Sequence, residues 1–473
     1  MNIILIQPEG ANSARFSIDN LREEEGILPP LGLLYIASFI KKYSKHKIEV
    51  LDNQINKLRG EVLYDFIKQR NPDLVGITCR SYYFYDTLNI AKIIKSVSKK
   101  IITVIGGHHT FIFPQETICF PEVDYIALGE GEFSFYKLLE YLSGSNHNGN
   151  LLDYGIIDKE NVKENIFKKQ IIEDLDNIHF PDRQLTDYTK YFNIMTKEGP
   201  TTSLISSRGC PFSCSFCTSR QEEFRGRSAL NVVSEIEYCL SLGIKEISMV
   251  DDNFTVNLKR VEDICDLIIL KGLKFRWDIK GRIDNINKTV LEKLFNAGCR
   301  RIQYGIETPN KRIQKILNKN IDVNKIKSTL IMTKEIGFET YADFMIGSPT
   351  ETKDEILNTI KMAKEYRLDY AHFGITMLMP GTPMYEQEVR EYNMKDMWKE
   401  YALNPTPNFF VPYSKTALNR KQLENLLALA YRSFYLRPVK VIKNLIYISS
   451  WDEMKRKINT ARKILFKNIS SQK

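Results

Sequence analysis

The chain has 473 residues, of which 43% are hydrophobic and 26% are charged, a balance that is ordinary for a globular protein. This length is enough for two or three domains. The formal net charge is +9, but the sequence contains no long run of Lys and Arg. Nucleic-acid binding is therefore not the expected function.

Eight cysteines are few for this length, and only three of them cluster. That usage predicts a reducing compartment and a metal site rather than a disulfide framework. Residues 1–7 are apolar but too short for the core of a signal peptide. No apolar run approaches the roughly 20 residues that span a bilayer, so we expect a cytoplasmic protein.

Residues 1–142 alternate short apolar strand patterns with segments of helical periodicity, such as Leu31–Lys42 and Asp86–Ser98. Five such units predict an α/β domain with an open, doubly wound, Rossmann-like (flavodoxin-like) parallel sheet. Its expected strands are Asn2–Ile6, Lys47–Leu51, Asp73–Thr78, Ile101–Ile105 and Asp124–Leu128.

Ligands of such sheets bind at the carboxyl ends of the strands. Adjacent glycines there let a ligand approach the backbone closely. A generic domain of this fold that binds little is the alternative. The candidate binding residues at these strand ends are Thr78 and Ser81, then Gly106, Gly107 and His108, and then Gly129, Glu130 and Gly131.

Residues 143–200 lose clear periodicity and begin with a polar, turn-rich run, so we predict a linker. From residue 201 to residue 390 strand and helix patterns recur, which predicts a partial (β/α)6 barrel of the TIM type with its catalytic residues at the carboxyl ends of the strands. The expected strands are Thr202–Ser206, Glu246–Val250, Phe275–Ile279, Arg301–Tyr304, Thr340–Ile346 and His372–Thr376.

Three thiols, Cys210, Cys214 and Cys217, follow the first of these strands at C-x3-C-x2-C spacing. Thiolates bind iron and zinc well, but structural zinc sites and ordinary 4Fe-4S clusters take four protein ligands. No fourth Cys or His lies nearby, and the next cysteine, Cys239, falls in an expected helix. Three thiolates on a 4Fe-4S cluster leave one iron open to chelate a substrate. A structural zinc loop is the alternative.

This spacing and the motifs that follow it resemble the radical S-adenosylmethionine (SAM) superfamily. The resemblance implies that the amino and carboxylate groups of SAM bind the open iron. The resemblance also implies cofactor contacts at successive strand ends: Phe216 over the cluster, Asp251 and Asp252 near the SAM amino group, Arg282 on its carboxylate, Glu307 near its ribose or amino group, and the backbone at Gly347 on adenine. For the two aspartates the alternative role is helix capping, and for Arg282 it is a surface ion pair.

The order of segments in residues 1–142 resembles the cobalamin-binding domain that is fused to some radical SAM barrels. The matching runs are Pro29–Ala37, Val104–His109 and Leu128–Glu132. The resemblance implies cobalamin as a third cofactor, held by the candidate residues of this domain. Domains that supply an axial histidine carry it in a D-x-H-x-x-G motif, which this chain lacks near its first strand. Base-off binding without a histidine ligand is therefore expected.

Residues 391–473 are basic and helical in pattern, which predicts a helical C-terminal domain. The run Ala430–Pro438 resembles a segment of cobalamin-dependent radical SAM enzymes that include tetrapyrrole cyclases and hopanoid methyltransferases. An aromatic stretch from Trp398 to Tyr413 is either core or the lining of a bulky apolar pocket. A basic amphipathic helix at Lys455–Lys467 is either a solvated face or a peripheral contact with an anionic membrane.

Together the two resemblances imply a cobalamin-dependent radical SAM enzyme with a small-molecule or lipid-like substrate and an external electron donor such as flavodoxin or ferredoxin. The commonest activity of that family is methyl transfer to an unactivated carbon through a 5′-deoxyadenosyl radical and methylcobalamin. A cobalamin-dependent oxidative cyclase or ring-rearranging enzyme is the enzymatic alternative. A non-enzymatic cobalamin or iron-sulfur sensor is the alternative of another class.

Overall fold

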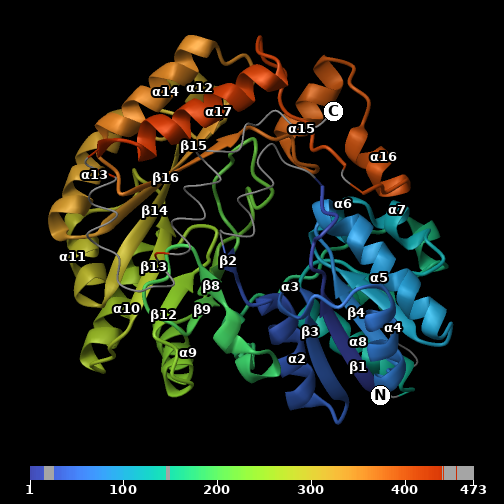
Figure 1. Cartoon of the computed structure of the whole chain (residues 1–473). Helices are drawn as coiled ribbons and strands as arrows, with labels where there is room; N and C mark the ends of the chain where they lie inside the picture. Colours follow the sequence, from blue (N-terminus) through green and yellow to red (C-terminus); the bar gives the residue numbers. More distant parts are fainter. Residues whose placement is uncertain (15–25, 145–149, 408, 439, 441–453, 455–473) are drawn as a thin grey trace. The chain divides into compact units, whose positions relative to one another are not determined.

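The computed structural model describes residues 1–14, 26–144, 150–407, 409–438, 440 and 454, so the predicted basic helix at 455–467 lies outside the described residues. The chain forms two compact units, each built around a parallel sheet (Figure 1). Unit 1 comprises residues 1–16, 29–190 and 395–410, and unit 2 comprises residues 17–28, 191–394 and 411–473. No helix among the described residues is long and apolar enough to cross a membrane.

Unit 1 holds a six-stranded sheet in the order β3-β1-β4-β5-β6-β7. The first five strands run parallel, and β7 joins the edge in the antiparallel direction. The predicted doubly wound sheet is confirmed, and the bounds of its five predicted strands hold to within one residue. The strands are β1 (Asn2–Gln7), β3 (Lys47–Asp52), β4 (Leu74–Thr78), β5 (Ile102–Gly106), β6 (Tyr125–Ala127) and β7 (Ile156–Ile157).

Helices cover both faces of this sheet because its strands are apolar on both sides. In β1, Ile3 and Leu5 enter the core beneath α2 and α8, whereas Ile4 and Ile6 enter the core beneath α4 and α5. Successive side chains of a strand point to opposite faces, so this apolar run fills two cores. The helices are α2 (Leu31–Tyr43), α3 (Asn53–Asn56), α4 (Gly60–Arg70), α5 (Phe84–Val97), α6 (His108–Ile112), α7 (Pro114–Ile118) and α8 (Gly131–Leu142).

A segment from the C-terminal part of the sequence completes unit 1. Helix α16 (Met397–Leu403) packs against α7, with Trp398 and Tyr401 almost fully buried. The Tyr401 hydroxyl accepts a hydrogen bond of 3.2 Å from the backbone N–H of Tyr85, and the Tyr401 ring lies 6.5 Å from that of Phe84. These two members of the predicted aromatic stretch are therefore core residues of unit 1.

Unit 2 holds a six-stranded sheet in the order β16-β15-β14-β13-β12-β9 with every strand parallel, which confirms the predicted partial barrel. The strands are β9 (Thr201–Leu204), β12 (Glu246–Met249), β13 (Arg276–Gly281), β14 (Cys299–Glu307), β15 (Glu339–Ile346) and β16 (Tyr370–Ile375). The helices are α9 (Ala229–Ser241), α10 (Leu258–Leu270), α11 (Lys288–Asn296), α12 (Lys311–Ile316), α13 (Val323–Ile336), α14 (Lys353–Glu365), α15 (Pro383–Glu391) and α17 (Arg420–Tyr435). Two short antiparallel pairs, β2 (Gly26–Ile27) with β8 (Phe192–Asn193) and β10 (Ser207–Arg208) with β11 (Arg225–Gly226), lie outside this sheet.

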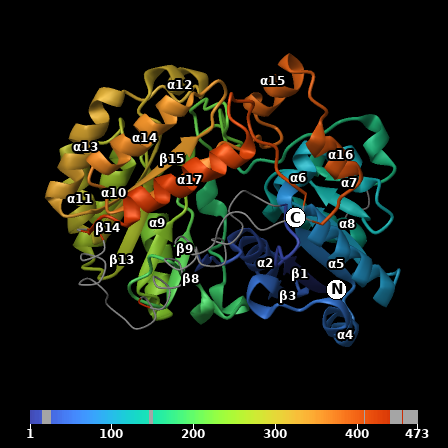
Figure 2. The same ribbon diagram turned by 45° about the horizontal axis from the view of Figure 1, so that its top comes forward.

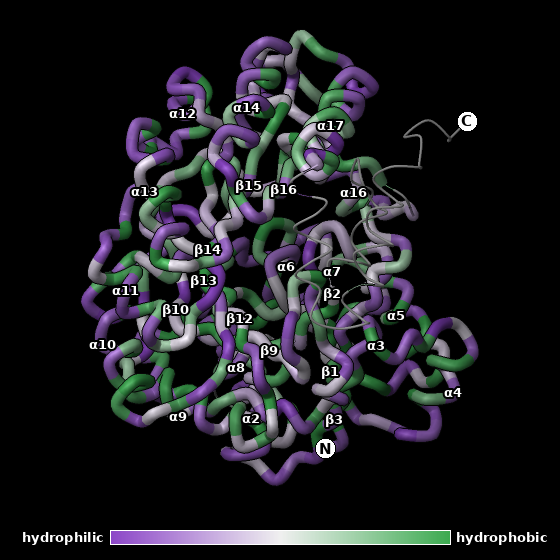
Figure 3. Tube along the Cα trace, turned by 60° about the vertical axis from the view of Figure 1, so that its left-hand side comes forward, coloured by the Kyte–Doolittle hydropathy of each residue, from purple (hydrophilic) through white to green (hydrophobic). Residues whose placement is uncertain are grey.

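The two faces of the barrel sheet differ in polarity. Ile302 and Tyr304 of β14 are fully buried on the face that the helices cover. The intervening Gln303 and, on β15, Asp343 lie on the opposite face and are only half-buried. The outer helices, such as α10 and α11, mix hydrophilic and hydrophobic residues along their length, as expected for amphipathic helices (Figure 3). Polar chemistry is therefore concentrated on the helix-free face of the sheet.

Helix α17 covers the free edge of β16. In Figure 2 this helix runs in front of the barrel sheet. The Tyr431 hydroxyl donates to the carbonyl of Phe373 and accepts from its N–H, at 3.0 and 3.2 Å. The Tyr435 hydroxyl makes the same pair of contacts with Ala371, at 2.9 and 3.1 Å. Two tyrosines one helical turn apart thus satisfy the backbone groups that an additional strand would otherwise bind.

We expect Tyr435→Phe to lower the free energy of unfolding by about 1–3 kcal/mol, because it leaves the buried N–H and C=O of Ala371 without partners. Urea unfolding followed by circular dichroism measures the change. Tyr392→Phe is the matched control, because Tyr392 is more than one-third exposed. Equal midpoints for Tyr435→Phe and the wild type would show that the edge does not depend on this hydroxyl.

Candidate active site

The cysteine loop, residues 209–224, connects β10 with β11. Its entry requires glycine: Gly209 has φ +84°, and a Cβ there would lie 2.1 Å from the carbonyl oxygen of Glu223. Backbone bonds then close the loop, from Glu222 N–H to the carbonyl of Cys210 at 3.1 Å and from Cys217 N–H to that of Cys214 at 3.2 Å. The loop is therefore held as one compact turn.

The three thiols are half-buried within this loop. Burial raises the pKa of each, that of Cys217 to about 11, and neighbouring cysteines raise the pKa of Cys210 and Cys217 further. No three His, Cys, Asp or Glu side chains among the described residues are placed to chelate one metal ion. A 4Fe-4S cluster makes a different demand, because each thiolate binds a separate iron. Three thiols of one short loop, with the cations Arg282 and Lys319 near enough to influence them, fit such an anionic group.

The two aspartates after β12 lie differently. Asp251 is buried and accepts hydrogen bonds from the N–H and Oγ of Ser206 at 2.7 and 2.5 Å and from the Oγ of Ser207 at 2.6 Å. It therefore anchors the start of the cysteine loop. Asp252 is exposed and lies near enough to Cys210 and Cys217 to raise their pKa values. Of the two, Asp252 is the one that faces the thiols.

Arg282 follows β13 and is nine-tenths buried. Its Nε lies 2.7 Å from Oδ1 of Asp284, its Nη2 donates to the carbonyl of Lys319 at 2.7 Å, and its guanidinium lies 4.3 Å from the ring centroid of Phe212. The SAM-carboxylate contact stays a prediction. The structure brings this arginine to the cysteine loop and gives it a carboxylate partner of its own.

Glu307 ends β14 with φ +63°, a left-handed conformation that is rare outside glycine. Burial raises its pKa, and Lys319 opposes that rise through an ion pair of 2.5 Å between Nζ and Oε1. Sequence reasoning missed Lys319. The only signal was its position between Asn318 and Asn320, two residues that tolerate left-handed turns.

Gly347, after β15, also requires glycine, because it has φ +74° and a Cβ there would lie 2.9 Å from Leu423. The predicted adenine contact of its backbone is untested. Glu351, four residues on, is fully buried and accepts from the N–H of Ser348 at 2.9 Å through Oε2. Its Oε1 has no hydrogen-bond partner among the described residues. Burial raises its pKa from 4.5 to about 7.

We expect Glu351→Gln to be more stable than the wild type at alkaline pH and equally stable in acid. The folded protein holds the Glu351 proton up to about pH 7, whereas the unfolded chain releases it near pH 4.5. Wild-type stability therefore falls between these pH values and stays low above them. The advantage of the variant should reach up to about 3 kcal/mol above pH 7.

Urea midpoints of both proteins from pH 4.5 to 8.5 measure this advantage. Glu355→Gln is a control of opposite sign, because Arg312 lowers the pKa of Glu355 to about 2. Its ionised form stabilises the fold above the unfolded pKa, so this variant should lose stability at neutral pH. A Glu351→Gln advantage that does not change with pH would contradict the expectation.

A row of polar side chains crosses the helix-free face at the middle of three strands, β14, β15 and β16. Gln303 of β14 donates to Oδ2 of Asp343 at 2.7 Å, and Oδ1 of Asp343 lies 3.6 Å from Nδ1 of His372 on β16. Asp343 and His372 both influence the pKa of Glu307, which places this row beside the Glu307–Lys319 pair. The row was not predicted.

The candidate cobalamin residues of unit 1 gather at the carboxyl ends of β4, β5 and β6, as predicted. Thr78 and Gly106 are half-buried and His108 is exposed. Ser81 is buried, with Oγ 3.1 Å from Nδ1 of His109, whose fully buried ring is tilted against that of Phe84 with the centroids 4.0 Å apart. An accessible polar edge fits the amide-rich periphery of cobalamin. The buried His109 is not placed to serve as an axial ligand.

Two of the candidate glycines have local packing reasons. A Cβ on Gly107, with φ +116°, would lie 2.5 Å from the carbonyl oxygen of Cys79, and one on Gly129, with φ +89°, would lie 2.3 Å from that of Gln170. Glu130 accepts from the N–H of Ile172 at 2.6 Å. Residues 170–172 of the predicted linker thus pack on this edge, and the cobalamin roles of these residues stay predictions.

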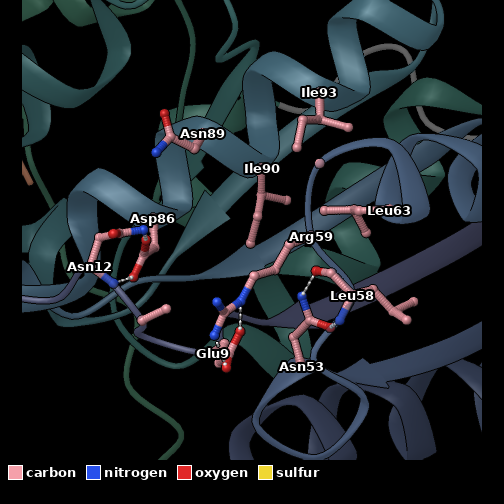
Figure 4. Close-up of a pocket in the computed structure, with 12 residues that line it drawn as sticks. Glu9, Asn12, Asn53, Leu58, Arg59, Leu63, Asp86, Asn89, Ile90 and Ile93 are labelled. Carbon is pink, nitrogen blue, oxygen red and sulfur yellow. Dashed lines mark hydrogen bonds and ion pairs between the residues drawn. The ribbon is translucent and has the colours of Figure 1, made fainter.

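A pocket of about 180 Å³ lies between α4 and α5, beside the segments that follow β1 and β3 (Figure 4). Its polar groups are paired: Asn12 donates to Asp86 through its N–H and its amide at 3.0 and 2.9 Å, and Arg59 forms an ion pair with Glu9. Its lining also includes Asn89, Asn53, which is bonded to the backbone of Leu58, and several apolar side chains. Nothing in this pocket indicates a ligand.

Comparisons with known proteins agree with these two units. The sequence model described as the Radical SAM superfamily matches residues 204–363, and that of the B12 binding domain matches residues 19–139. An uncharacterized methyltransferase of Pyrococcus horikoshii is 34% identical over 88% of this chain and 90% of its own length. The anaerobic magnesium-protoporphyrin IX monomethyl ester cyclase of Rubrivivax gelatinosus is 27% identical over 88% of this chain and 75% of its own length.

Solved structures share the fold. The radical SAM methyltransferase TsrM from Kitasatospora setae, with cobalamin and a [4Fe-4S] cluster bound, matches with a TM-score of 0.72 at 16% identity, over 98% of this chain and 99% of that one. The cobalamin-dependent radical SAM enzyme OxsB matches with a TM-score of 0.71 at 14% identity, over 97% and 71%. With the similarity to the Pyrococcus protein, these matches show that the chain belongs to the family of radical SAM proteins that carry a B12-binding domain.

Proposed function

We propose that this chain transfers a methyl group to an unactivated carbon of a small-molecule substrate. Family membership gives it a 4Fe-4S cluster, SAM and cobalamin as cofactors. When bound, these groups supply an electron, a hydrogen-abstracting radical and a methyl donor. The observation that carries the proposal is the relative described as a methyltransferase, which matches nearly the whole length of both chains.

The residues of unit 2 support specific roles in this reaction. Cys210, Cys214 and Cys217 would hold the cluster, with Phe216 packed beside it. Asp252 and Glu307 would accept hydrogen bonds from the amino group or ribose of SAM, and the backbone at Gly347 would contact adenine. Arg282 would contact the SAM carboxylate only if it gave up part of its pairing with Asp284.

Unit 1 would hold cobalamin at the carboxyl ends of its strands, base-off and without a histidine ligand. The accessible residues at that edge, among them Thr78, Gly106 and His108, support this role. We propose that residues 1–142, 201–390 and 391–473 are the functional divisions of the chain, with residues 143–200 as the linker between the first two. Flavodoxin or ferredoxin as the electron donor and a cytoplasmic location are further parts of this proposal.

The polar row formed by Gln303, Asp343 and His372 supports a substrate that carries a hydrogen-bonding group rather than a purely lipid-like one. These side chains lie on the helix-free face, where Oδ1 of Asp343 lies 3.6 Å from Nδ1 of His372 and Oδ2 accepts from Gln303. A hydroxyl, amine or carboxylate of the substrate could then bind at the row while the reacting carbon faces the cofactors.

The test is anaerobic reconstitution of the protein with iron, sulfide and hydroxocobalamin. The reconstituted protein is then reduced in the presence of SAM that carries an isotopically labelled methyl group. A labelled methyl group on the bound cobalamin, together with release of 5′-deoxyadenosine, would support the methyltransferase. Absence of both from protein with a complete cluster and stoichiometric cobalamin would refute it.

An oxidative cyclase is the second candidate, because the Rubrivivax cyclase matches 88% of this chain. It would release 5′-deoxyadenosine without moving label to cobalamin, and its product would lose hydrogens rather than gain a methyl group. A sensor would bind cobalamin or SAM and release no 5′-deoxyadenosine on reduction.

A further inference from the structure

A second loop holds the cysteine loop in place. The last residue of α12 and the four residues after it, 316–320, form what we call the Lys319 loop. The N–H of Ser215 donates to the carbonyl of Leu317 at 2.9 Å, and its Oγ donates to the carbonyl of Ile316 at 3.1 Å. Asn318 donates through its amide to both the carbonyl and the Oγ of Ser213, at 2.9 and 3.0 Å. Residues on either side of Cys214 are thus bound to the same short segment.

The backbone of the Lys319 loop is itself fixed. Asn318 and Asn320 have left-handed φ values of 47° and 51°, and their amides bond to each other at 2.7 Å. Between them, the carbonyl of Lys319 accepts from Nη2 of Arg282 at 2.7 Å. Asparagine is the residue besides glycine that adopts this conformation at least cost, so the sequence around Lys319 suits a rigid turn.

The side chain of Lys319 is almost buried and points toward the site. Its Nζ lies 2.5 Å from Oε1 of Glu307 and 5.9 Å from the ring centroid of Phe216, the residue before Cys217. A Cβ on Gly305 would lie 2.5 Å from this Nζ and 2.8 Å from the same Glu307 oxygen. The missing side chain at Gly305 therefore makes room for the Lys319–Glu307 pair.

The charge of Lys319 lies beside the cysteine loop. The Lys319 loop is hydrogen-bonded to Ser213 and Ser215, the two neighbours of Cys214. The Lys319 Nζ lies near the ring of Phe216 and beside the Glu307 carboxylate. A 4Fe-4S cluster becomes more negative when it gains an electron. A nearby cation stabilises the reduced form more than the oxidised form, and a nearby carboxylate does the reverse. Protein charge and burial are known levers on cluster potentials.

We propose that Lys319 is a positioning residue that raises the reduction potential of the cluster. Its positive charge stabilises the reduced cluster, and Glu307 offsets part of that charge. The Lys319 loop holds the charge beside the cysteine loop. The proposal requires the cluster but not methyl transfer. It therefore stands or falls separately from the proposed function.

The experiment compares the reconstituted wild type with Lys319→Met, Lys319→Arg and Glu307→Gln in the absence of SAM. Iron and sulfide content report cluster assembly, and electron paramagnetic resonance in a dye-mediated redox titration reports the midpoint potential. Lys319→Met should favour the oxidised cluster about tenfold, which is about 59 mV more negative for a one-electron couple. Lys319→Arg should restore the wild-type potential, and Glu307→Gln should shift it to more positive values.

Lys259→Met is the matched control, because it removes the charge of an exposed lysine of α10 that pairs with Asp263. This variant should change the midpoint potential by only a small fraction of the shift that Lys319→Met produces. Loss of iron from Lys319→Met that Lys319→Arg restores would also support the proposal. A fully loaded Lys319→Met protein with the wild-type potential would overturn it, as would a Lys259→Met shift equal to that of Lys319→Met.

Discussion

Cys214→Ala is expected to assemble no complete cluster and to release no 5′-deoxyadenosine from SAM. The cysteine loop offers three thiols, and the described residues place no spare ligand beside them. A cluster with two protein ligands would expose two irons, so the site that chelates SAM would no longer be defined. Iron content, the visible absorption of the cluster and chromatographic assay of 5′-deoxyadenosine each measure the loss.

Cys119→Ser provides the matched control for that result. Cys119 is an exposed cysteine of unit 1 that lies outside the cysteine loop. The Cys119→Ser protein should load as much iron as the wild type and cleave SAM at the same rate. A Cys214→Ala protein with a full cluster and normal cleavage would remove the cysteine loop from the mechanism.

Arg301→Met is expected to destabilise unit 2 by about 3–5 kcal/mol, the cost of leaving buried charges without a partner. Arg301 is 3% exposed, and its Nη2 lies 2.7 Å from Oδ2 of Asp278. Glu246 and Glu339 lie 3.9 and 3.8 Å from the same guanidinium. Without it, Glu246 and Glu339 keep Arg276 as a partner, at 3.9 and 2.9 Å, whereas Asp278 loses its ion pair. Urea unfolding followed by circular dichroism measures the loss.

Two further variants identify the cause of that loss. Asp278→Asn in the Arg301→Met background removes one unpaired carboxylate and should recover part of the stability. Lys259→Met, which removes an exposed lysine of α10, should leave the midpoint unchanged. Arg301 lies near the amino end of β14, so the variant should still load its cluster when folded. If the double variant recovered nothing, the loss would come from packing rather than from charge.

The sequence predicted the parts of the molecule whose signals are local. Apolar runs of strand length placed the strands of both sheets, and the spacing of Cys210, Cys214 and Cys217 placed the cysteine loop after β9. The role of Asp251 is a harder case. Its position at a strand end fits a cofactor ligand, but in the structure its oxygens accept from Ser206 and Ser207. Local sequence does not show which of two adjacent aspartates turns inward.

Other features depend on residues that are distant in the sequence. Lys319 meets Glu307 and Phe216 only because two loops pack together, and no periodicity reports such a contact. Trp398 and Tyr401 form an ordinary amphipathic pattern, and their partners in unit 1 lie about three hundred residues earlier in the chain. Contacts of this kind arise from tertiary packing, so they require coordinates.

The two tyrosines of α17 also bear on how the protein is made. Strand β16 ends at residue 375, but the hydroxyls that occupy its edge arrive only with residues 431 and 435. Synthesis runs from the N-terminus, so the barrel can assemble while that edge is still open to any passing strand. A nascent chain that stalls between residues 375 and 431 would expose the unpaired backbone groups along the edge of β16. Translation speed and chaperone access over this stretch should therefore influence the yield of native protein more than they do elsewhere in the chain.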